Sequence, residues 1–359
     1  MKNFFSTKIG IILVGAVIGV VAIVLQKLGN PPNMGLCIAC FERDIAGALG
    51  FHRAGVVQYI RPEITGILLG SFLISLFFKE FKPRSGSSSI IRFFLGFFAM
   101  IGALVFLGCP WRAFLRLAGG DLNALIGILG LILGIFIGTV FIRNGYNLGR
   151  SRPSQNKVAG WIMPVVMIAL FLMLIFQFKP IIFSEKGPGA MYAPIFISLI
   201  AGLIIGGLAQ RSRFCTMGSI RDIIIVKDFH LFSGVASFAI SAFILNLIFG
   251  QFKAGFVSQS VAHDVHLWNF LGMVLSGLAF ALAGGCPGRQ LILSGEGDTD
   301  SVIFVFGMFT GAAFSHNFSM ASSPKGIGTF GTYGTITGII FCLIIGFTII
   351  QKRKVRSLK

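Results

Sequence analysis

Ten long apolar runs divide this chain of 359 residues. Each is about 17–22 residues long, the length that an α-helix needs to cross the hydrocarbon core of a bilayer. Hydrophobic residues make up 55% of the chain and charged residues only 12%, and the mean hydropathy is +0.87. The sequence therefore predicts an all-α, polytopic helical membrane protein with about ten transmembrane helices. The runs cover residues 8–26, 62–78, 90–108, 122–142, 161–178, 191–209, 230–252, 267–284, 301–318 and 335–351.

A Cys-Pro-x-Arg motif occurs twice at the ends of apolar runs, at 109–112 and at 286–289, an offset of 177. Eight residues after each arginine comes a Gly-Asp pair, at 120–121 and 297–298. We expect both aspartates to cap the helices that follow them. Polar and ionisable residues inside a membrane are costly, so their default interpretation is functional.

The residues after Cys37 and Cys215 form a second repeated motif. Residues 37–45 read Cys-Ile-Ala-Cys-Phe-Glu-Arg-Asp-Ile, and residues 215–223 read Cys-Thr-Met-Gly-Ser-Ile-Arg-Asp-Ile, an offset of 178. Each copy follows the first apolar run of its half of the chain. The two halves therefore each carry two cysteines and two arginines at the ends of apolar segments.

These offsets predict two pseudo-symmetric repeats, at 1–178 and 191–351, joined by a linker at 179–190 and followed by a basic tail at 352–359. Each repeat contains five of the ten runs. An odd number of crossings brings the second repeat into the membrane from the opposite side. The count therefore predicts inverted repeats, related by a pseudo-twofold axis in the membrane plane.

The chain has a formal net charge of +18. With both termini inside, the inner segments hold 20 of the 30 Lys and Arg residues, which is the bias expected of cytoplasmic loops. The N- and C-termini are therefore predicted to be cytoplasmic. An electropositive path for an anion is a second and compatible interpretation. No basic stretch is interleaved with a soluble fold, so a nucleic acid partner is not predicted.

Cys109 and Cys286 are predicted to cap short re-entrant helices. Proline cannot continue the preceding helix, but it suits the first position of a new one. A thiol at such a cap faces the positive end of the helix dipole and unsatisfied N–H groups, a geometry that binds anions. One turn later, Arg112 and Arg289 add a fixed positive charge on nearly the same face.

The second motif carries an Arg-Asp pair six residues after its cysteine. Arg43 and Arg221 either belong to an anion path or form structural ion pairs with Asp44 and Asp222. Cys40 has no equivalent in the second repeat, where glycine occupies the matching position.

Two other classes of function stay open at this point. Cys37-x-x-Cys40 has the spacing of a redox dithiol, which is typical of a membrane thiol-disulfide oxidoreductase. In a simple anion channel, by contrast, the arginines matter and the cysteines do not. The sequence contains no P-loop and no hydrolase nucleophile motif. Transport driven by ATP hydrolysis in this chain is therefore not expected. We predict a transporter rather than an enzyme, with no metal site and no cofactor.

The stretches around the cysteines resemble the YeeE/YedE membrane protein family. Asn-Met-Gly-Leu-Cys-Ile-Ala-Cys at 33–40, Arg-Phe-Cys-Thr at 213–216 and Gly-Gly-Cys at 284–286 carry this resemblance, which extends from about residue 8 to 345. The residues at 108–110 and 119–124 are similar, more specifically, to the YedE-type branch associated with selenium metabolism.

That family includes thiosulfate transporters of bacterial inner membranes. The resemblance implies that this chain imports a small sulfur- or selenium-containing anion across a bacterial cytoplasmic membrane. It also implies that cysteines along the path pass the substrate on by hydrogen bonds rather than by covalent capture. With inverted repeats, Cys37 and Cys109 line the outer half of the path, and Cys215 and Cys286 line the inner half.

The chemistry of these side chains agrees with that implication. A thiol suits a polarisable sulfur or selenium atom, while arginine and helix N-termini suit oxyanion charge. The expected partners are the anion, the lipid bilayer and, by family analogy alone, a cytoplasmic sulfur- or selenium-carrier protein. The predicted substrate path comprises Cys37, Cys109, Cys215, Cys286, Arg43, Arg112, Arg221 and Arg289, with Cys40, Asp44 and Asp222 as secondary candidates.

Overall fold

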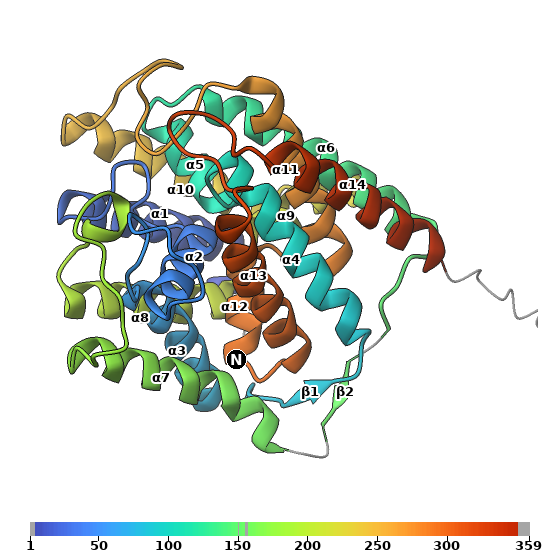
Figure 1. The fold of residues 1–359 in the computed structure, drawn as a ribbon. Coiled ribbons are helices and arrows are strands. Elements are labelled where there is room, and N and C mark those ends of the chain that lie inside the picture. The colour runs from blue at the N-terminus through green and yellow to red at the C-terminus, as the bar shows by residue number, and fades with distance from the viewer. Residues whose placement is uncertain (1–3, 150, 155–156, 351–359) are drawn as a thin grey trace, which may run out of the picture.

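The structure is a computed structural model that describes residues 4–149, 151–154 and 157–350. Helices make up nearly all of its regular structure (Figure 1). The basic tail predicted at 352–359 lies outside the described residues. The α-helices are α1 (Lys8–Lys27), α2 (Ile38–Ala48), α3 (Pro62–Phe77), α4 (Ser89–Phe106), α5 (Pro110–Ala118), α6 (Asn123–Arg143), α7 (Ile162–Ile175), α8 (Ile195–Ser212), α9 (Thr216–Val226), α10 (His230–Ile248), α11 (His266–Ala283), α12 (Pro287–Gly295), α13 (Thr299–Asn317) and α14 (Gly331–Thr348). The short elements are η1 (Phe4–Ser6), η2 (Lys157–Trp161), η3 (Pro188–Ala190), β1 (Arg84–Ser85) and β2 (Arg152–Pro153).

Each of the ten predicted apolar runs overlaps one of the longer helices, which confirms the all-α, polytopic class. Within the described residues, eight helical segments are long and apolar enough to cross a membrane. Three of these segments combine a long helix with the short helix that follows it. The helix α3, with 16 residues, is a shorter apolar helix.

Long and short helices follow the same order in both halves of the chain. From α1 to α7 and from α8 to α14 the order is long, short, long, long, short, long, long. Helices from different halves pack against each other, α1 on α10, α3 on α8, α4 on α13 and α6 on α11, while α4 and α11 also meet. The helices α7 and α14 lie at opposite margins of the molecule (Figure 1).

Glycines allow two of these helix pairs to approach closely. A methyl group added to Gly130 would overlap the backbone oxygen of Phe270, and one added to Gly307 would overlap that of Phe93. Both contacts recur at the offset of 177, since residue 130 corresponds to 307 and residue 93 to 270. Small residues at such crossings let helix backbones pack in a membrane, where the hydrophobic effect does not drive helix association.

We expect Gly307→Ala to lower the free energy of unfolding by about 1–3 kcal/mol, because the added methyl group forces α13 away from α4. Thermal unfolding of the detergent-solubilised protein measures this loss. Gly55→Ala is the control, since a methyl group there would lie 3.9 Å from its nearest neighbour, Oε1 of Gln58. Equal melting temperatures for the Gly307→Ala variant and the wild-type protein would contradict the close packing.

Loops that were predicted on the same side of the membrane contact one another. On the inner side, the ladder of β1 and β2 joins the loop after α3 to the loop after α6, and Lys82 donates its backbone N–H to the oxygen of Glu296 at 3.0 Å. On the outer side, the N–H of Lys253 donates to the oxygen of Gly119 at 2.9 Å. Which side is cytoplasmic stays a prediction.

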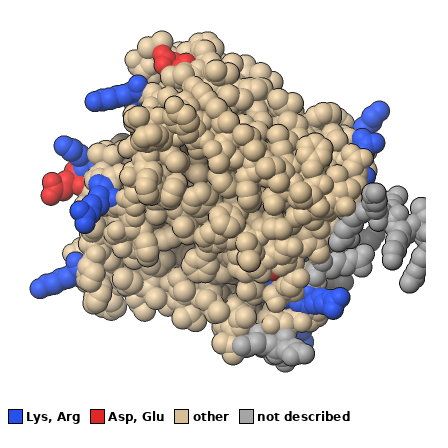
Figure 2. Space-filling view, turned by 45° about the vertical axis from the view of Figure 1, so that its right-hand side comes forward, with Lys and Arg blue, Asp and Glu red and all other residues tan. Residues whose placement is uncertain are grey.

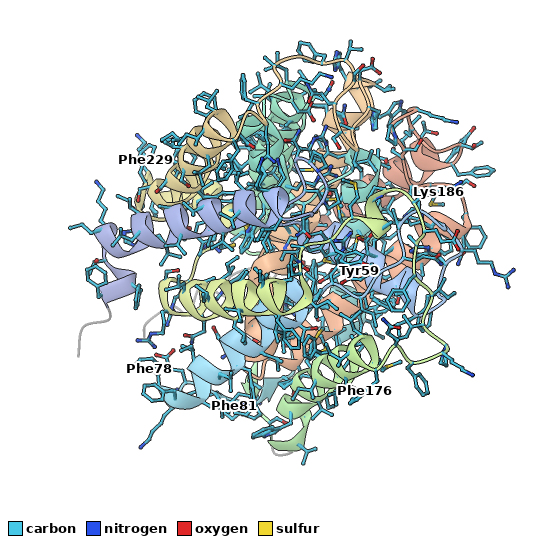
Figure 3. All side chains as sticks on the ribbon, turned by 90° about the vertical axis from the view of Figure 1, so that its left-hand side faces the viewer. Tyr59, Phe78, Phe81, Phe176, Lys186 and Phe229 are labelled. Carbon is cyan, nitrogen blue, oxygen red and sulfur yellow. The ribbon has the colours of Figure 1, made fainter. Side chains whose placement is uncertain are left out.

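The surface and the two ends of the molecule agree with helices that cross a membrane and loops that lie on its two sides. In Figure 2, Lys and Arg lie at the margins of the face that is shown, and its centre consists of other residues. Figure 3 places Phe78 and Phe229 toward one end of the molecule and Lys186 toward the other. Large apolar side chains are exposed between the loops, among them Ile248 at 66% and Phe347 at 68%, as expected of a surface in contact with lipid.

Candidate functional site

Four short helices each begin at one of the repeated cysteines. Cys37 is the N-cap of α2, Cys109 of α5, Cys215 of α9 and Cys286 of α12, and all four cysteines have extended backbone conformations. Proline occupies the first helical position of α5 and α12. The prediction that Cys109 and Cys286 cap short helices is therefore confirmed.

These four cysteines form two pairs. The sulfur atoms of Cys37 and Cys109 lie 3.8 Å apart, and those of Cys215 and Cys286 lie 3.7 Å apart. All four side chains are buried and all are free thiols. A disulfide needs sulfur atoms about 2.05 Å apart, so each pair is a contact between two thiols. Each pair joins the two N-caps of one half of the chain.

In each pair, the sulfur atom of one cysteine accepts a hydrogen bond from a backbone N–H group. The N–H of Cys40 donates to Sγ of Cys37 at 3.3 Å, and the N–H of Gly218 donates to Sγ of Cys215 at 3.2 Å. Cys109 and Cys286 are the N-caps of α5 and α12 without a side-chain capping hydrogen bond. Each thiol pair therefore lies where the N-termini of two short helices meet, and both helix dipoles favour negative charge there.

Arg112 is held by backbone oxygens. Its Nε donates to the oxygen of Asn33 at 3.1 Å, and its terminal nitrogens donate to the oxygen atoms of Leu107 and Val261, the latter at 3.1 Å. One terminal nitrogen also lies 3.7 Å from Sγ of Cys40. The guanidinium is fully buried, so its charge is fixed next to Cys40, whose N–H donates to Sγ of Cys37.

Arg43 and Asp44 form the ion pair that was one of two open interpretations. Asp44 accepts from Arg43 at 2.7 Å and from Arg61 at 2.8 Å, and all three side chains are buried. Arg61 also donates to the backbone oxygens of Met191 and Pro188, at 2.9 and 2.7 Å. This buried cluster connects α2 to the segment before α8.

In the second half, the equivalent pair is more open. Arg221 contacts Asp222 at 2.8 Å, with side chains that are 33% and 24% exposed. Arg289 lies 3.4 Å from Glu296 and is 15% exposed. Arg289 lies in the wall of an open cavity.

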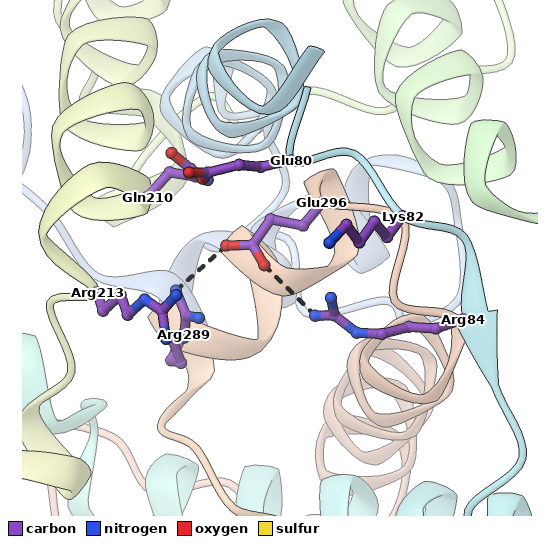
Figure 4. Close-up of a pocket in the computed structure, with 7 residues that line it drawn as sticks. All are labelled: Glu80, Lys82, Arg84, Gln210, Arg213, Arg289 and Glu296. Atoms are coloured by element: carbon purple, nitrogen blue, oxygen red, sulfur yellow. Dashed lines mark hydrogen bonds and ion pairs between the residues drawn. The ribbon is translucent and has the colours of Figure 1, made fainter. Parts of the chain in front are cut away.

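That cavity has a volume of about 340 Å³ and a charged lining (Figure 4). Glu296 lies 3.4 Å from Arg289 and 3.4 Å from Arg84, as the dashed lines in Figure 4 show. Four of the seven lining residues are basic and two are acidic. The lining consists of Glu80, Lys82, Arg84, Gln210, Arg213, Arg289 and Glu296.

Hydrogen bonds and ion pairs stabilise the charged forms of Glu80 and Arg84 in this cavity. Partial burial alone would raise the pKa of Glu80, but hydrogen bonds from Gln210 and Arg211 lower it. Burial alone would lower the pKa of Arg84, but the carboxylates of Asp298 and Glu296 raise it. The cavity therefore keeps an excess of positive charge at neutral pH. Two of its lining residues are close in sequence to the second thiol pair, since Arg213 precedes Cys215 by two residues and Arg289 follows Cys286 by three.

The Gly-Asp aspartates differ in what they cap. Asp298 is the N-cap of α13 and accepts from the N–H of Ser301 at 3.1 Å, as predicted. The prediction for Asp121 was wrong in part, because α6 begins after Leu122. Asp121 still accepts from the N–H of Asn123 at 3.0 Å, but its other oxygen pairs with the buried Arg116 at 2.6 Å. That ion pair holds Asp121 one residue ahead of the cap position.

Sequence reasoning missed several of these residues. Arg116 follows Arg112 by four residues, so both lie on one face of α5, and this spacing was a usable signal. Arg61 stands alone before Pro62 and gave no signal of its own. The remaining cavity residues come from loops and helix ends that are far apart in the sequence, and their basic residues were interpreted as topological.

The second half of the chain matches a known protein family. Residues 211–356, which include Cys215 and Cys286, match the model of the family described as Sulphur transport. The thiosulfate transporter TsuA of Escherichia coli (strain K12) is 34% identical over 116 residues, which are 32% of this chain and 32% of that protein. The thiosulfate transporter TsuA of Spirochaeta thermophila is 31% identical over 106 residues, which are 29% of this chain and 31% of that protein.

The chain thus spans about a third of the length of the curated relatives it matches. Both relatives are named transporters, and the matched family region contains the second thiol pair and Arg289. These matches agree with the resemblance that the cysteine motifs gave. The second half of the chain is thus similar to the YeeE/YedE sulphur transport family.

Proposed function

We propose that this protein carries a small sulfur-containing anion across a bacterial cytoplasmic membrane, with thiosulfate as the first candidate. The observation that carries the proposal is the pair of thiol contacts, Cys37–Cys109 and Cys215–Cys286, each at the meeting point of two helix N-termini. Free thiols donate weak hydrogen bonds and suit a polarisable sulfur atom, while helix N-termini stabilise the oxyanion charge.

The path runs from one thiol pair to the other. In the predicted inverted topology, Cys37 and Cys109 meet the anion in the outer half, with the fixed charge of Arg112 beside them. Cys215 and Cys286 meet it in the inner half. The basic cavity then receives it, because Arg213 and Arg289 attract an anion that leaves the second pair. No covalent bond to sulfur is needed in this sequence of steps.

A selenium-containing anion is the finer proposal for the substrate. It is supported by the resemblance of residues 108–124 to the branch associated with selenium metabolism. Selenium is also a polarisable atom, which suits contact with thiol groups. A cytoplasmic sulfur- or selenium-carrier protein that collects the substrate at the basic cavity is part of the same proposal.

Uptake into proteoliposomes of the purified protein tests the substrate. Labelled thiosulfate is compared with selenium-75 as selenite and as selenide, under a controlled redox potential. We expect saturable thiosulfate entry that empty liposomes lack. Selenium entry that excess thiosulfate does not inhibit would assign the chain to selenium import instead. Entry of neither anion, together with a reversible Cys37–Cys40 disulfide, would favour the oxidoreductase.

We expect Arg289→Gln to raise the KM for thiosulfate about threefold to tenfold, because it removes one of the four cations of the cavity. The difference in KM between the variant and the wild-type protein should become smaller as the salt concentration rises, since salt screens charges at partly exposed positions. Initial uptake rates at low and high ionic strength measure both effects. Lys325→Gln is the control, because Lys325 lies in the exposed loop after α13, and its KM should stay that of the wild-type protein.

A further inference from the structure

The two copies of the Cys-Pro-x-Arg motif differ at their third position. Trp111 occupies it in the first copy and Gly288 in the second, at the same offset of 177 as the cysteines. The two motifs thus pair the largest side chain with the smallest residue. The side chain of Trp111 is fully buried.

These two equivalent positions face each other. A methyl group added to Gly288 would lie 2.8 Å from Cζ2 and 3.3 Å from Nε1 of the Trp111 indole. The indole therefore fills the space that a side chain at 288 would need. A second Trp at this position would not fit, so the difference between the two copies is a condition for their close approach.

The indole also contacts the motif that leads into the second thiol pair. Its centroid lies 5.5 Å from the ring of Phe214 in an edge-to-face arrangement, and Phe214 directly precedes Cys215. Trp111 itself follows Cys109 by two residues. A single aromatic side chain thus lies between residues that flank one thiol pair and residues that flank the other.

The N–H group of this indole has no hydrogen-bond partner among the described residues. A buried Trp N–H usually finds a partner, so an unpaired one is unusual. Its nitrogen faces Gly288, within the first turn of α12 and two residues from Cys286. An anion that moves from the first thiol pair to the second would pass a donor that no protein group occupies.

We propose that Trp111 is the barrier between the two thiol pairs and that its indole N–H donates a hydrogen bond to the anion during passage. The inference rests on the proposed transport function. It adds a residue that limits passive ion leak and contributes to substrate specificity. The ring blocks the route when no substrate is bound. Its N–H then contributes to the recognition of an oxyanion and contributes nothing to an apolar solute.

Two substitutions separate the roles of the ring and the N–H group. Trp111→Ala removes both, and Trp111→Phe keeps an aromatic ring but removes the donor. Two quantities are measured in proteoliposomes, the passive iodide flux and the kcat/KM for thiosulfate. The control is Trp268→Phe, a half-buried tryptophan at the start of α11. Size-exclusion profiles show which variants fold.

We expect Trp111→Ala to raise the passive iodide flux at least about tenfold, and Trp111→Phe to leave that flux unchanged while lowering the kcat/KM for thiosulfate about tenfold. Trp268→Phe should change neither quantity. If the alanine variant does not fold, the phenylalanine variant alone decides, and a wild-type kcat/KM for thiosulfate in that variant would overturn the inference.

The outcomes also distinguish this inference from the proposed function. Wild-type protein that transports thiosulfate, with Trp111 variants that match it in both quantities, would refute the barrier and leave the transporter standing. Wild-type protein that carries no thiosulfate, with an alanine variant that leaks iodide, would support the barrier and refute the substrate.

Discussion

Alanine at both Cys109 and Cys286 is expected to lower thiosulfate uptake by at least about 100-fold. Each cysteine belongs to a different thiol pair, so the double variant removes one thiol from each half of the path. A hydrogen bond to a charged group contributes about 1.5–3 kcal/mol, and each 1.4 kcal/mol corresponds to about tenfold in affinity. Losing one such bond in each half gives the expected size of the effect.

Initial rates of labelled thiosulfate uptake measure this loss. Cys342→Ala is the matched control, because Cys342 is equally buried but belongs to α14 and to neither thiol pair. Serine at 109 and 286 should retain part of the uptake, since a hydroxyl also donates a hydrogen bond. Unchanged uptake in the double alanine variant would exclude a thiol path and favour a channel in which the arginines alone attract the anion.

The helix ends at the cysteines could be predicted because local chemistry fixes them. Proline at 110 and at 287 ends one helix and begins the next, whatever the surroundings are. That rule gave both the caps and the short helices α5 and α12. The apolar runs gave the long helices for a similar reason, because a helix that crosses a bilayer needs one continuous apolar segment.

The partners of those cysteines could not be predicted in the same way. Cys37 and Cys109 are 72 residues apart, and their contact depends on how α2 and α5 are placed by the long helices around them. The same holds for Asp44, whose second ion-pair partner, Arg61, lies in a different segment of the chain. Spacing along the chain carries no information about contacts that the tertiary fold creates.

The basic cavity illustrates the same limit. Lys82, Arg213 and Arg289 come from three separate segments, and in the sequence each one is explained equally well by the cytoplasmic excess of positive charge. Their convergence on one cavity is seen only in the tertiary structure. Charge counts along a membrane protein therefore do not predict which basic residues meet in one cavity.

Asp44→Ala is expected to lower the free energy of unfolding by about 3–5 kcal/mol. Its carboxylate is buried between Arg43 and Arg61, at 2.7 and 2.8 Å, so its removal leaves two buried guanidinium groups without their acid. Such a loss is a large part of the stability of a typical protein. Thermal or denaturant unfolding in detergent, followed by circular dichroism, measures the change.

The second repeat supplies the matched control. Asp222 occupies the position equivalent to Asp44 and pairs with Arg221 at 2.8 Å, but this pair is partly exposed. Partly exposed ion pairs contribute about 0–1 kcal/mol, so Asp222→Ala should have a small effect on unfolding. Equal losses in both variants would mean that burial does not distinguish the two pairs. A small loss at Asp44 with reduced thiosulfate uptake would instead return Arg43 to the substrate path, because Asp44 would then act by holding Arg43 in position for the anion.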